Sequence, residues 1–215
     1  MSTRIIDISG FGHSGKTAVS DLLREIEGVH AHHLSFEFGL LRLPDGILDL
    51  EKALCLDWSP SRSDRAIKRF GKLCLMLSEG YGKALNGSFW EESKNYLDSL
   101  IEGRLFVDGW FDGLYDVPRV NAQKEILKKL GLLTIATGLR NLLSRPKQPS
   151  SEKTEVFLTT PEDFLQKTKV YLNKILCSES QNKQTAILTN NMMEPFSPSR
   201  SIKFFDDAYC VIVER

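Results

Sequence analysis

The segment that most constrains how this chain can fold is an eight-residue, glycine-rich stretch near its N-terminus. Residues 10–17 read Gly-Phe-Gly-His-Ser-Gly-Lys-Thr and match the pattern G-x-x-x-x-G-K-[ST]. The segment before it, residues 4–8, is short and rich in β-branched isoleucine, which predicts a buried strand. Residues 18–26 after it carry apolar side chains at helical spacing. A strand, a glycine loop and a helix in this order predict a phosphate-binding site.

The residue types of the loop explain how it would bind phosphate. Glycines let the backbone curl so that successive N–H groups point at one anion, and the helix dipole adds to the attraction. Lys16 is expected to reach the terminal phosphates, and Thr17 to hold Mg²⁺ through its hydroxyl. The predicted phosphate-binding residues are Gly10, Gly12, His13, Ser14, Gly15, Lys16, Thr17 and Ala18. A turn that matches by chance is the alternative, which the flanking elements disfavour.

Composition narrows the class of protein. A chain of 215 residues with 41% hydrophobic residues can build one domain with a sizeable core. Its formal net charge of zero disfavours a dedicated nucleic-acid binder. The four cysteines are far apart and form no C-x-x-C pair, which disfavours a zinc ribbon or a redox dithiol. This use of cysteine fits a protein of the reduced, cytoplasmic compartment. We find no signal peptide pattern and no apolar stretch long enough to span a bilayer.

Apolar runs alternate with helical segments along the chain. Residues 29–36, 104–108, 185–190 and 209–213 read as strands. Helix starts are predicted at Ser61 with Asp64, at Ser88 with Glu91, and at Thr160 followed by proline. Another long helix is predicted within 121–145.

Strands of this apolar kind, separated by helices, indicate an α/β fold in three layers, with a mainly parallel sheet covered on both faces. We therefore expect a single domain over residues 1–215. A helical insert at about 47–102 would bind substrate or form a lid, and a mobile loop is expected at about 146–154.

Asp108 is the second predicted active-site residue. It ends the apolar run 104–107, and the end of a strand beside the glycine loop is where a carboxylate can orient Mg²⁺ or its water. An Asp at a strand end is equally an ordinary turn former or helix cap. Asp112 and Asp116 follow in the same loop as weaker alternatives.

Three other groups of polar residues each leave more than one interpretation open. His30 and His32 are spaced to share one face of a strand and could bind a metal, or they simply lie on a partly exposed strand followed by His33, since no cysteine or tight acidic cluster completes a ligand set. Glu37 could act as a general base, bind a substrate hydroxyl, or be a surface carboxylate. Basic residues between Arg62 and Lys72 could clamp an anion or form a solvated helix face.

Over residues 4–26 the chain resembles the P-loop nucleotide-binding superfamily. The Lys16-Thr17 ending is similar to that of its small-molecule and nucleotide kinases. This resemblance implies a three-layer P-loop fold, ATP with Mg²⁺ as donor, and phosphoryl transfer to a small-molecule acceptor. It further implies catalytic roles for Lys16 and Asp108, with Thr17 and Asp108 as metal ligands.

The C-terminal segment resembles another branch, the sulfotransferases, which take the sulfate donor PAPS. Residues 202–215 are similar to the strand that leads to their Arg-x-Pro-[RK]-Asp motif, so the resemblance implies that Arg215 contacts the 3′-phosphate of PAPS. Their loop usually reads [KR]-S-G-T-T. Here His13 replaces the basic residue and Lys16 replaces a threonine.

Three functions therefore stay open. The first is an ATP–Mg²⁺ kinase, the second a PAPS-dependent sulfotransferase acting on a sugar or small metabolite, and the third a non-catalytic nucleotide-binding module. A buried parallel strand needs a helix to cover it, and no further helix follows residues 209–213. We therefore expect a C-terminally truncated chain, or a partner, such as a second copy, that covers the last strand.

Overall fold

The computed structural model divides the chain into two compact units, Met1–Glu102 with Phe157–Arg215, and Gly103–Val156. It describes residues 4–10, 13–32, 36–85, 87–101, 103–105, 154–156, 158–177 and 186–214. In the second unit the described elements are strands β3 (Gly103–Leu105) and β4 (Thr154–Val156), which pair antiparallel. The helix predicted within 121–145 lies outside the described residues, and so does the loop predicted at 146–154, apart from Thr154.

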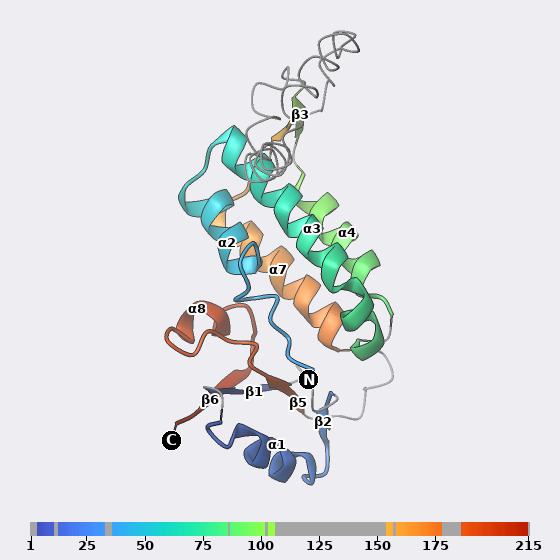
Figure 1. The fold of residues 1–215 in the computed structure, drawn as a ribbon. Helices are drawn as coiled ribbons and strands as arrows, with labels where there is room; N and C mark the ends of the chain where they lie inside the picture. Colours follow the sequence, from blue (N-terminus) through green and yellow to red (C-terminus); the bar gives the residue numbers. More distant parts are fainter. Residues whose placement is uncertain are drawn as a thin grey trace, which may run out of the picture. The chain divides into compact units, whose positions relative to one another are not determined.

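The first unit is built on a four-stranded parallel sheet with the order β2-β5-β1-β6 (Figure 1). Its strands are β1 (Arg4–Gly10), β2 (Val29–Ala31), β5 (Ala186–Asn190) and β6 (Ala208–Val213). All three neighbouring pairs run parallel, and Ile6 lies opposite Leu188 on one side and Tyr209 on the other. The predicted parallel α/β fold is confirmed. The strand expected over residues 29–36 is shorter than predicted, because the chain leaves the sheet after Ala31.

Helices cover the sheet on both faces. Helix α1 (Lys16–Arg24) packs on one face, and the helical insert lies on the other (Figure 1). The remaining helices are α2 (Ile47–Glu51), the π-helical turn η1 (Lys52–Leu56), α3 (Pro60–Ala84), α4 (Phe89–Leu100), α7 (Pro161–Leu176) and α8 (Ser199–Ile202). The main core lies between the sheet and these helices. Its largest buried side chains are Phe38, Phe70, Phe89, Phe164 and Phe204.

Polar caps explain where two of the long helices begin. Thr160 caps α7 as predicted, because its hydroxyl accepts a hydrogen bond from the Asp163 N–H at 3.1 Å. Helix α3 starts earlier than expected: Ser59 is its cap and Pro60 its first residue. Helix α4 also forms as expected, but Ser88 makes no side-chain capping hydrogen bond.

A buried carboxylate joins the central strand to the segment that follows β5. Asp7 has no solvent exposure, although it lies in the middle of β1. Its Oδ1 accepts hydrogen bonds from the Thr189 hydroxyl (2.8 Å) and the Met192 N–H (3.0 Å). Its Oδ2 accepts from the Ser9 hydroxyl (2.5 Å) and the Met193 N–H (3.0 Å). Four donors therefore compensate for the burial of one charge, as such groups require.

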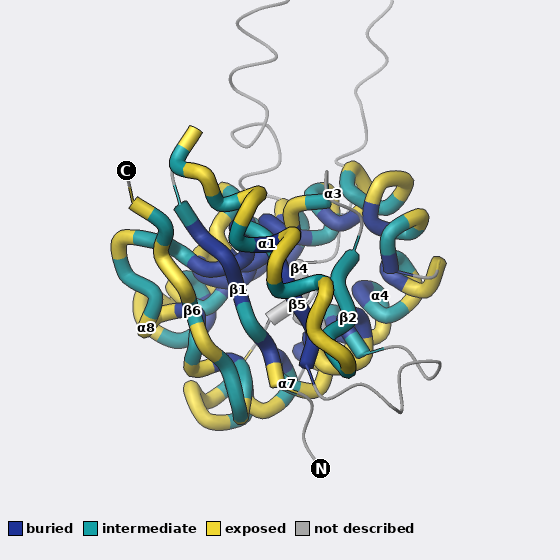
Figure 2. Tube along the Cα trace, turned by 90° about the horizontal axis from the view of Figure 1, so that it is seen from below, coloured by how far each residue is buried: buried dark blue, intermediate teal, exposed yellow. Residues whose placement is uncertain are grey.

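The burial pattern separates the inner strands from the sheet's β6 edge. Strands β1 and β5 are largely buried, whereas β6 and the outer face of α1 carry exposed positions (Figure 2). Tyr209 and Val211 lie opposite Ile6 and Ile8 in the register, so they share the face that α1 covers. They are 54% and 39% exposed because α1 shields β1 rather than β6.

We predict that Asp7→Asn lowers the free energy of unfolding by about 2–4 kcal/mol, because an amide group would face backbone donors and leave some unpaired. Urea denaturation of the purified protein measures this change. The matched control is Asp206→Asn, whose exposed carboxylate pairs with Lys169. It should cost less than about 1 kcal/mol. Equal losses for the two variants would contradict the central role given to Asp7.

Candidate functional site

The glycine-rich loop joins the end of β1 to the start of α1, as the sequence predicts. Strand β1 ends at Gly10 and helix α1 begins at Lys16. His13 and Gly15 have left-handed backbone conformations, with φ values of 64° and 90°. Gly15 precedes the helix and its carbonyl accepts the Ala18 N–H at 3.0 Å. Glycine adopts this left-handed conformation at the N-cap of a helix without strain.

Gly10 is required for a different reason, the close approach of a neighbouring strand. A Cβ atom added at Gly10 would lie 2.7 Å from the Val213 carbonyl oxygen and 2.9 Å from the Ser14 hydroxyl. Any larger residue would therefore separate β6 from the start of the loop. The other predicted glycine of the loop, Gly12, lies outside the described residues.

Lys16 does not extend freely into solvent. Its side chain is only 16% exposed, and its Nζ lies 3.1 Å from Oε1 of Glu37. Glu37 comes from the segment that follows β2, where two aromatic residues flank it. Phe36 and Phe38 pack against Tyr81 of α3, with ring centroids 5.1 and 5.4 Å away. The Tyr81 hydroxyl also accepts the Gly39 N–H at 2.7 Å, so the helical insert fixes the segment that carries Glu37.

Asn191 links Glu37 to the loop. Its side-chain NH₂ donates to Glu37 Oε1 at 2.7 Å, and its Oδ1 accepts the Gly10 N–H at 3.3 Å. Its backbone carbonyl accepts from Arg42 Nε at 2.7 Å, and Arg42 approaches Glu37 Oε2 to 4.0 Å. We call Lys16, Glu37, Arg42 and Asn191 the Glu37 cluster. It gathers two cations, one carboxylate and one amide at the carboxyl end of the sheet, where α/β proteins bind ligands.

The pKa of Glu37 reflects opposing influences. Partial burial acts to raise it, but hydrogen bonds from Lys16 and Asn191, with the charges of Lys16 and Arg42, lower it below its ordinary value. Glu37 is therefore ionised at neutral pH.

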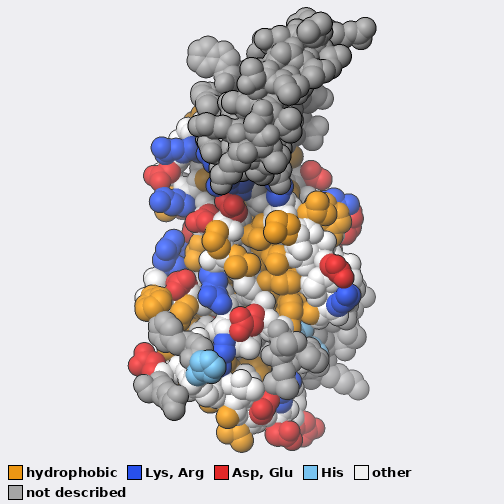
Figure 3. Space-filling model, in the orientation of Figure 1, with side chains coloured by type: hydrophobic (Ala, Val, Ile, Leu, Met, Phe, Trp, Pro, Cys, Tyr) orange, Lys and Arg blue, Asp and Glu red, His pale blue; other side chains and the backbone are white. Residues whose placement is uncertain are grey.

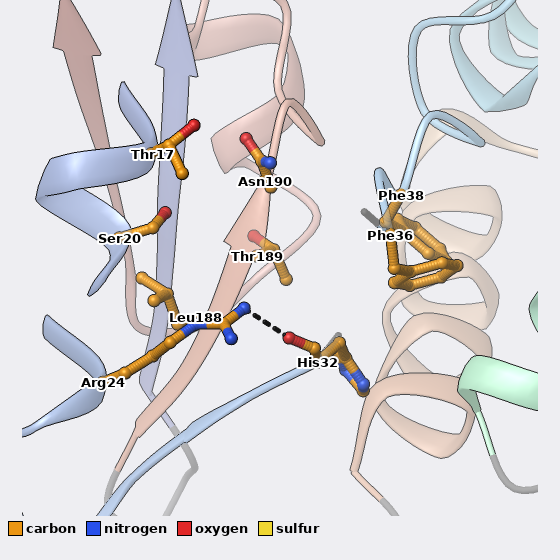
Figure 4. A pocket seen from close by; sticks show the side chains of 9 residues that line it. All are labelled: Thr17, Ser20, Arg24, His32, Phe36, Phe38, Leu188, Thr189 and Asn190. Atoms are coloured by element: carbon orange, nitrogen blue, oxygen red, sulfur yellow. Dashed lines mark hydrogen bonds between the residues drawn. The ribbon is translucent and has the colours of Figure 1, made fainter. Parts of the chain in front are cut away.

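A second feature is a small cavity between α1, β5 and the chain that leaves β2 (Figure 4). Its volume of about 20 Å³ is enough for one water molecule. Its lining residues are Thr17, Ser20, Arg24, His32, Phe36, Phe38, Leu188, Thr189 and Asn190. Three of their polar atoms are buried without a hydrogen-bond partner: Arg24 Nε, His32 Nε2 and Asn190 Oδ1. The Arg24 guanidinium also donates to the His32 carbonyl at 2.5 Å.

His30 and His32 make ring contacts near the end of β2. The rings of His30 and His32 meet edge to face at 5.2 Å, and His32 contacts Phe36 at 5.5 Å. Within the described residues, no three His, Cys, Asp or Glu side chains group as metal ligands would. His33 lies outside those residues. Burial lowers the pKa of His32 to about 4, helped by the nearby His30 and Arg24.

Strand β5, which lies directly beside β1, ends in amides. Thr189 and Asn190 close this strand and Asn191 follows it. The sequence predicts Asp108 at the end of a strand beside the loop, but Asp108 lies outside the described residues. The described strand that precedes it, β3, pairs antiparallel with β4. Arg215 is also outside them, although Val213 of β6 lies opposite Gly10. Both assignments stay predictions.

Asn191 belongs to the Glu37 cluster, but the sequence pattern does not identify it as a site residue. Residues 185–190 predict only a buried strand, and nothing local connects its end to Glu37, which is 154 positions away. The amides that end the strand are the one feature that could have indicated a polar site there.

The basic helix face is at least partly neutralised. Lys68 pairs with Asp64 at 2.9 Å, and Arg69 pairs with Asp45 at 3.2 Å. On the face drawn in Figure 3, Lys and Arg side chains lie interspersed with Asp and Glu. These pairings favour the solvated helix face over an anion clamp.

A scan against protein-family models, a search of curated proteins and a search of solved structures each found no match. Across the part of the chain that the structure describes, no helix has the length and apolar character needed to cross a membrane.

We predict that His32 makes stability depend on pH. In the unfolded chain its imidazole binds a proton near pH 6.5, whereas in the folded protein the pKa is about 4. The stability that the buried, neutral imidazole contributes is therefore fully present above pH 6.5 and is lost as the pH falls toward 4. Over this range the free energy of unfolding should fall by at most about 1.4 kcal/mol per pH unit. Urea unfolding between pH 7.5 and 5 should show a shallower decline for His32→Gln than for the original protein; parallel declines would refute this.

Proposed function

We propose that this protein binds the phosphates of ATP–Mg²⁺ at residues 10–18 and transfers a phosphoryl group to a small-molecule acceptor. The observation that carries the proposal is the pairing of Lys16 with Glu37 at the end of β1, beside a loop with left-handed turns that leads into a helix N-terminus. This arrangement combines a cation for the donor phosphates with a carboxylate for the acceptor.

The loop and the first turn of α1 supply the donor side. Lys16 would neutralise charge on the transferring phosphoryl group, and the backbone N–H groups of Gly15 to Thr17 would bind the phosphates. The Ala18 N–H would join them by sharing its hydrogen with the Gly15 carbonyl that it contacts in the ligand-free protein. Thr17 is exposed in the first turn of α1, so its hydroxyl is free to reach Mg²⁺. Asp108 stays a proposed second ligand of the metal.

Glu37 supplies the acceptor side. Because its pKa is lowered, it is a weak base at neutral pH. Its main role would be to accept a hydrogen bond from the acceptor hydroxyl and orient it toward the phosphate, since positioning dominates this chemistry.

A PAPS-dependent transfer is the second candidate, and one observation favours it. Strand β6, which carries the sulfotransferase-like sequence, lies directly beside β1 with Val213 opposite Gly10. In this version Arg215 would contact the donor.

The third candidate, a nucleotide-binding module without turnover, draws support from the amides rather than carboxylates at the end of β5. A cytoplasmic location accords with all three, since none of the four cysteines forms a disulfide.

We predict that Lys16→Ala reduces nucleotide binding and any transfer at least about 100-fold, because it removes the cation that offsets phosphate charge. Isothermal titration calorimetry with ATP–Mg²⁺ measures the binding. The matched control is Lys83→Ala, which removes an exposed lysine paired with Glu79. It should bind as the original protein does. Retained binding in Lys16→Ala, with an unchanged melting temperature, would remove the basis of the proposal.

We predict further that ATP–Mg²⁺ raises the melting temperature more than ATP with a chelator, because a ligand of the native state stabilises it. A panel adding ADP–Mg²⁺, GTP–Mg²⁺ and adenosine 3′,5′-bisphosphate separates the candidates. A metal-independent shift with the bisphosphate alone would favour PAPS. A shift without product from any acceptor would favour the binding module.

A further inference from the structure

We propose that Glu37 is a built-in competitor of phosphate: its carboxylate holds Lys16 in the ligand-free protein, and a phosphate ligand must displace it. This inference rests on the proposed function, because it assigns Lys16 to phosphate binding. It adds a device that sets the affinity of the loop for anions.

The first step of the argument is the state of Lys16. Its ammonium group is the cation that the loop offers to phosphate, yet it already has a carboxylate partner at 3.1 Å and is mostly buried. An arriving phosphate and Glu37 would both need this ammonium. Two anions gathered around one cation repel each other, more strongly in a partly buried site than in water.

The second step is the rigidity of Glu37. Asn191 donates to the same Glu37 oxygen that Lys16 contacts, at 2.7 Å. Asn191 is itself only 8% exposed and its N–H is bound to the Ile8 carbonyl at 3.1 Å. Although the Glu37 side chain is 47% exposed, its hydrogen bonds to Lys16 and Asn191 orient the carboxylate toward the loop, which reduces the entropy it loses on pairing.

The third step is the loop itself. The Oδ1 of Asn191 accepts the Gly10 N–H, so one amide binds both the loop backbone and Glu37. Displacing Glu37 from Lys16 thus disturbs a contact shared with the start of the loop. A second ligand that engages Glu37, such as an acceptor hydroxyl or Mg²⁺, would release Lys16 and make phosphate binding cooperative with its own.

The test measures binding of inorganic pyrophosphate, with metal removed by a chelator, to a double-mutant cycle. The variants are Glu37→Gln, Glu37→Ala, Lys16→Ala and Lys16→Ala/Glu37→Gln. We expect Glu37→Gln and Glu37→Ala to bind pyrophosphate about tenfold more tightly than the original protein. This gain should vanish in the Lys16→Ala background, since coupled residues are not additive. Glu79→Gln, which changes the net charge equally at an exposed pair, should bind as the original does.

The outcomes separate the two proposals. If pyrophosphate binds through Lys16 but both Glu37 variants match the original, the competitor role is refuted and the phosphate site stands. An equal gain with Glu79→Gln would also refute it, because net charge alone would then explain the change. If neither pyrophosphate nor ATP–Mg²⁺ binds, or if Lys16→Ala binds both as tightly as the original, both proposals fail. Melting temperatures of all variants establish that each is folded.

Discussion

The carboxylate of Asp7 accepts four hydrogen bonds from three parts of the chain, and much of the described structure follows from that constraint. Two of its donors are the backbone N–H groups of Met192 and Met193, which lie just after β5. A buried charge with this many partners cannot move without exposing unpaired donors. The segment after β5 is therefore anchored to the middle of β1, inside the core rather than at the surface.

This anchor also shapes the polar site. Asn191 stands between the end of β5 and the two anchored methionines, and its backbone is left-handed with φ of 51°. From that position its side chain reaches both the Gly10 N–H and Glu37. The aromatic residues on either side of Glu37 hold it from the opposite direction, through Tyr81 of the helical insert. Residues from the end of β5 and a segment held by the insert thus meet the glycine loop at the Glu37 cluster.

The parts predicted well from the sequence are those governed by local rules. The strand and the helix on either side of the glycine loop depend on backbone geometry and apolar spacing, and both form, as β1 and α1. The parallel sheet follows from apolar strands separated by helices. Thr160 caps its helix for the same local reason, whereas Ser88 makes no capping bond although its pattern matches. The sequence singles out Glu37 as a candidate polar residue of the site, but it does not reveal that Asn191 binds it.

By itself, the sequence determined that this chain has a glycine-rich loop between a buried strand and a helix in an α/β fold, because glycine torsions and hydrophobic periodicity act over a few residues. Only the tertiary structure decided that Lys16 meets Glu37, that Asn191 connects them to Gly10, and that Asp7 fixes the neighbouring segment. Those contacts join residues between 21 and 186 positions apart. They depend on the order β2-β5-β1-β6, which brings the late strand β5 beside β1. The physical reason is that strand order is set by how the whole core packs, and no local pattern encodes it.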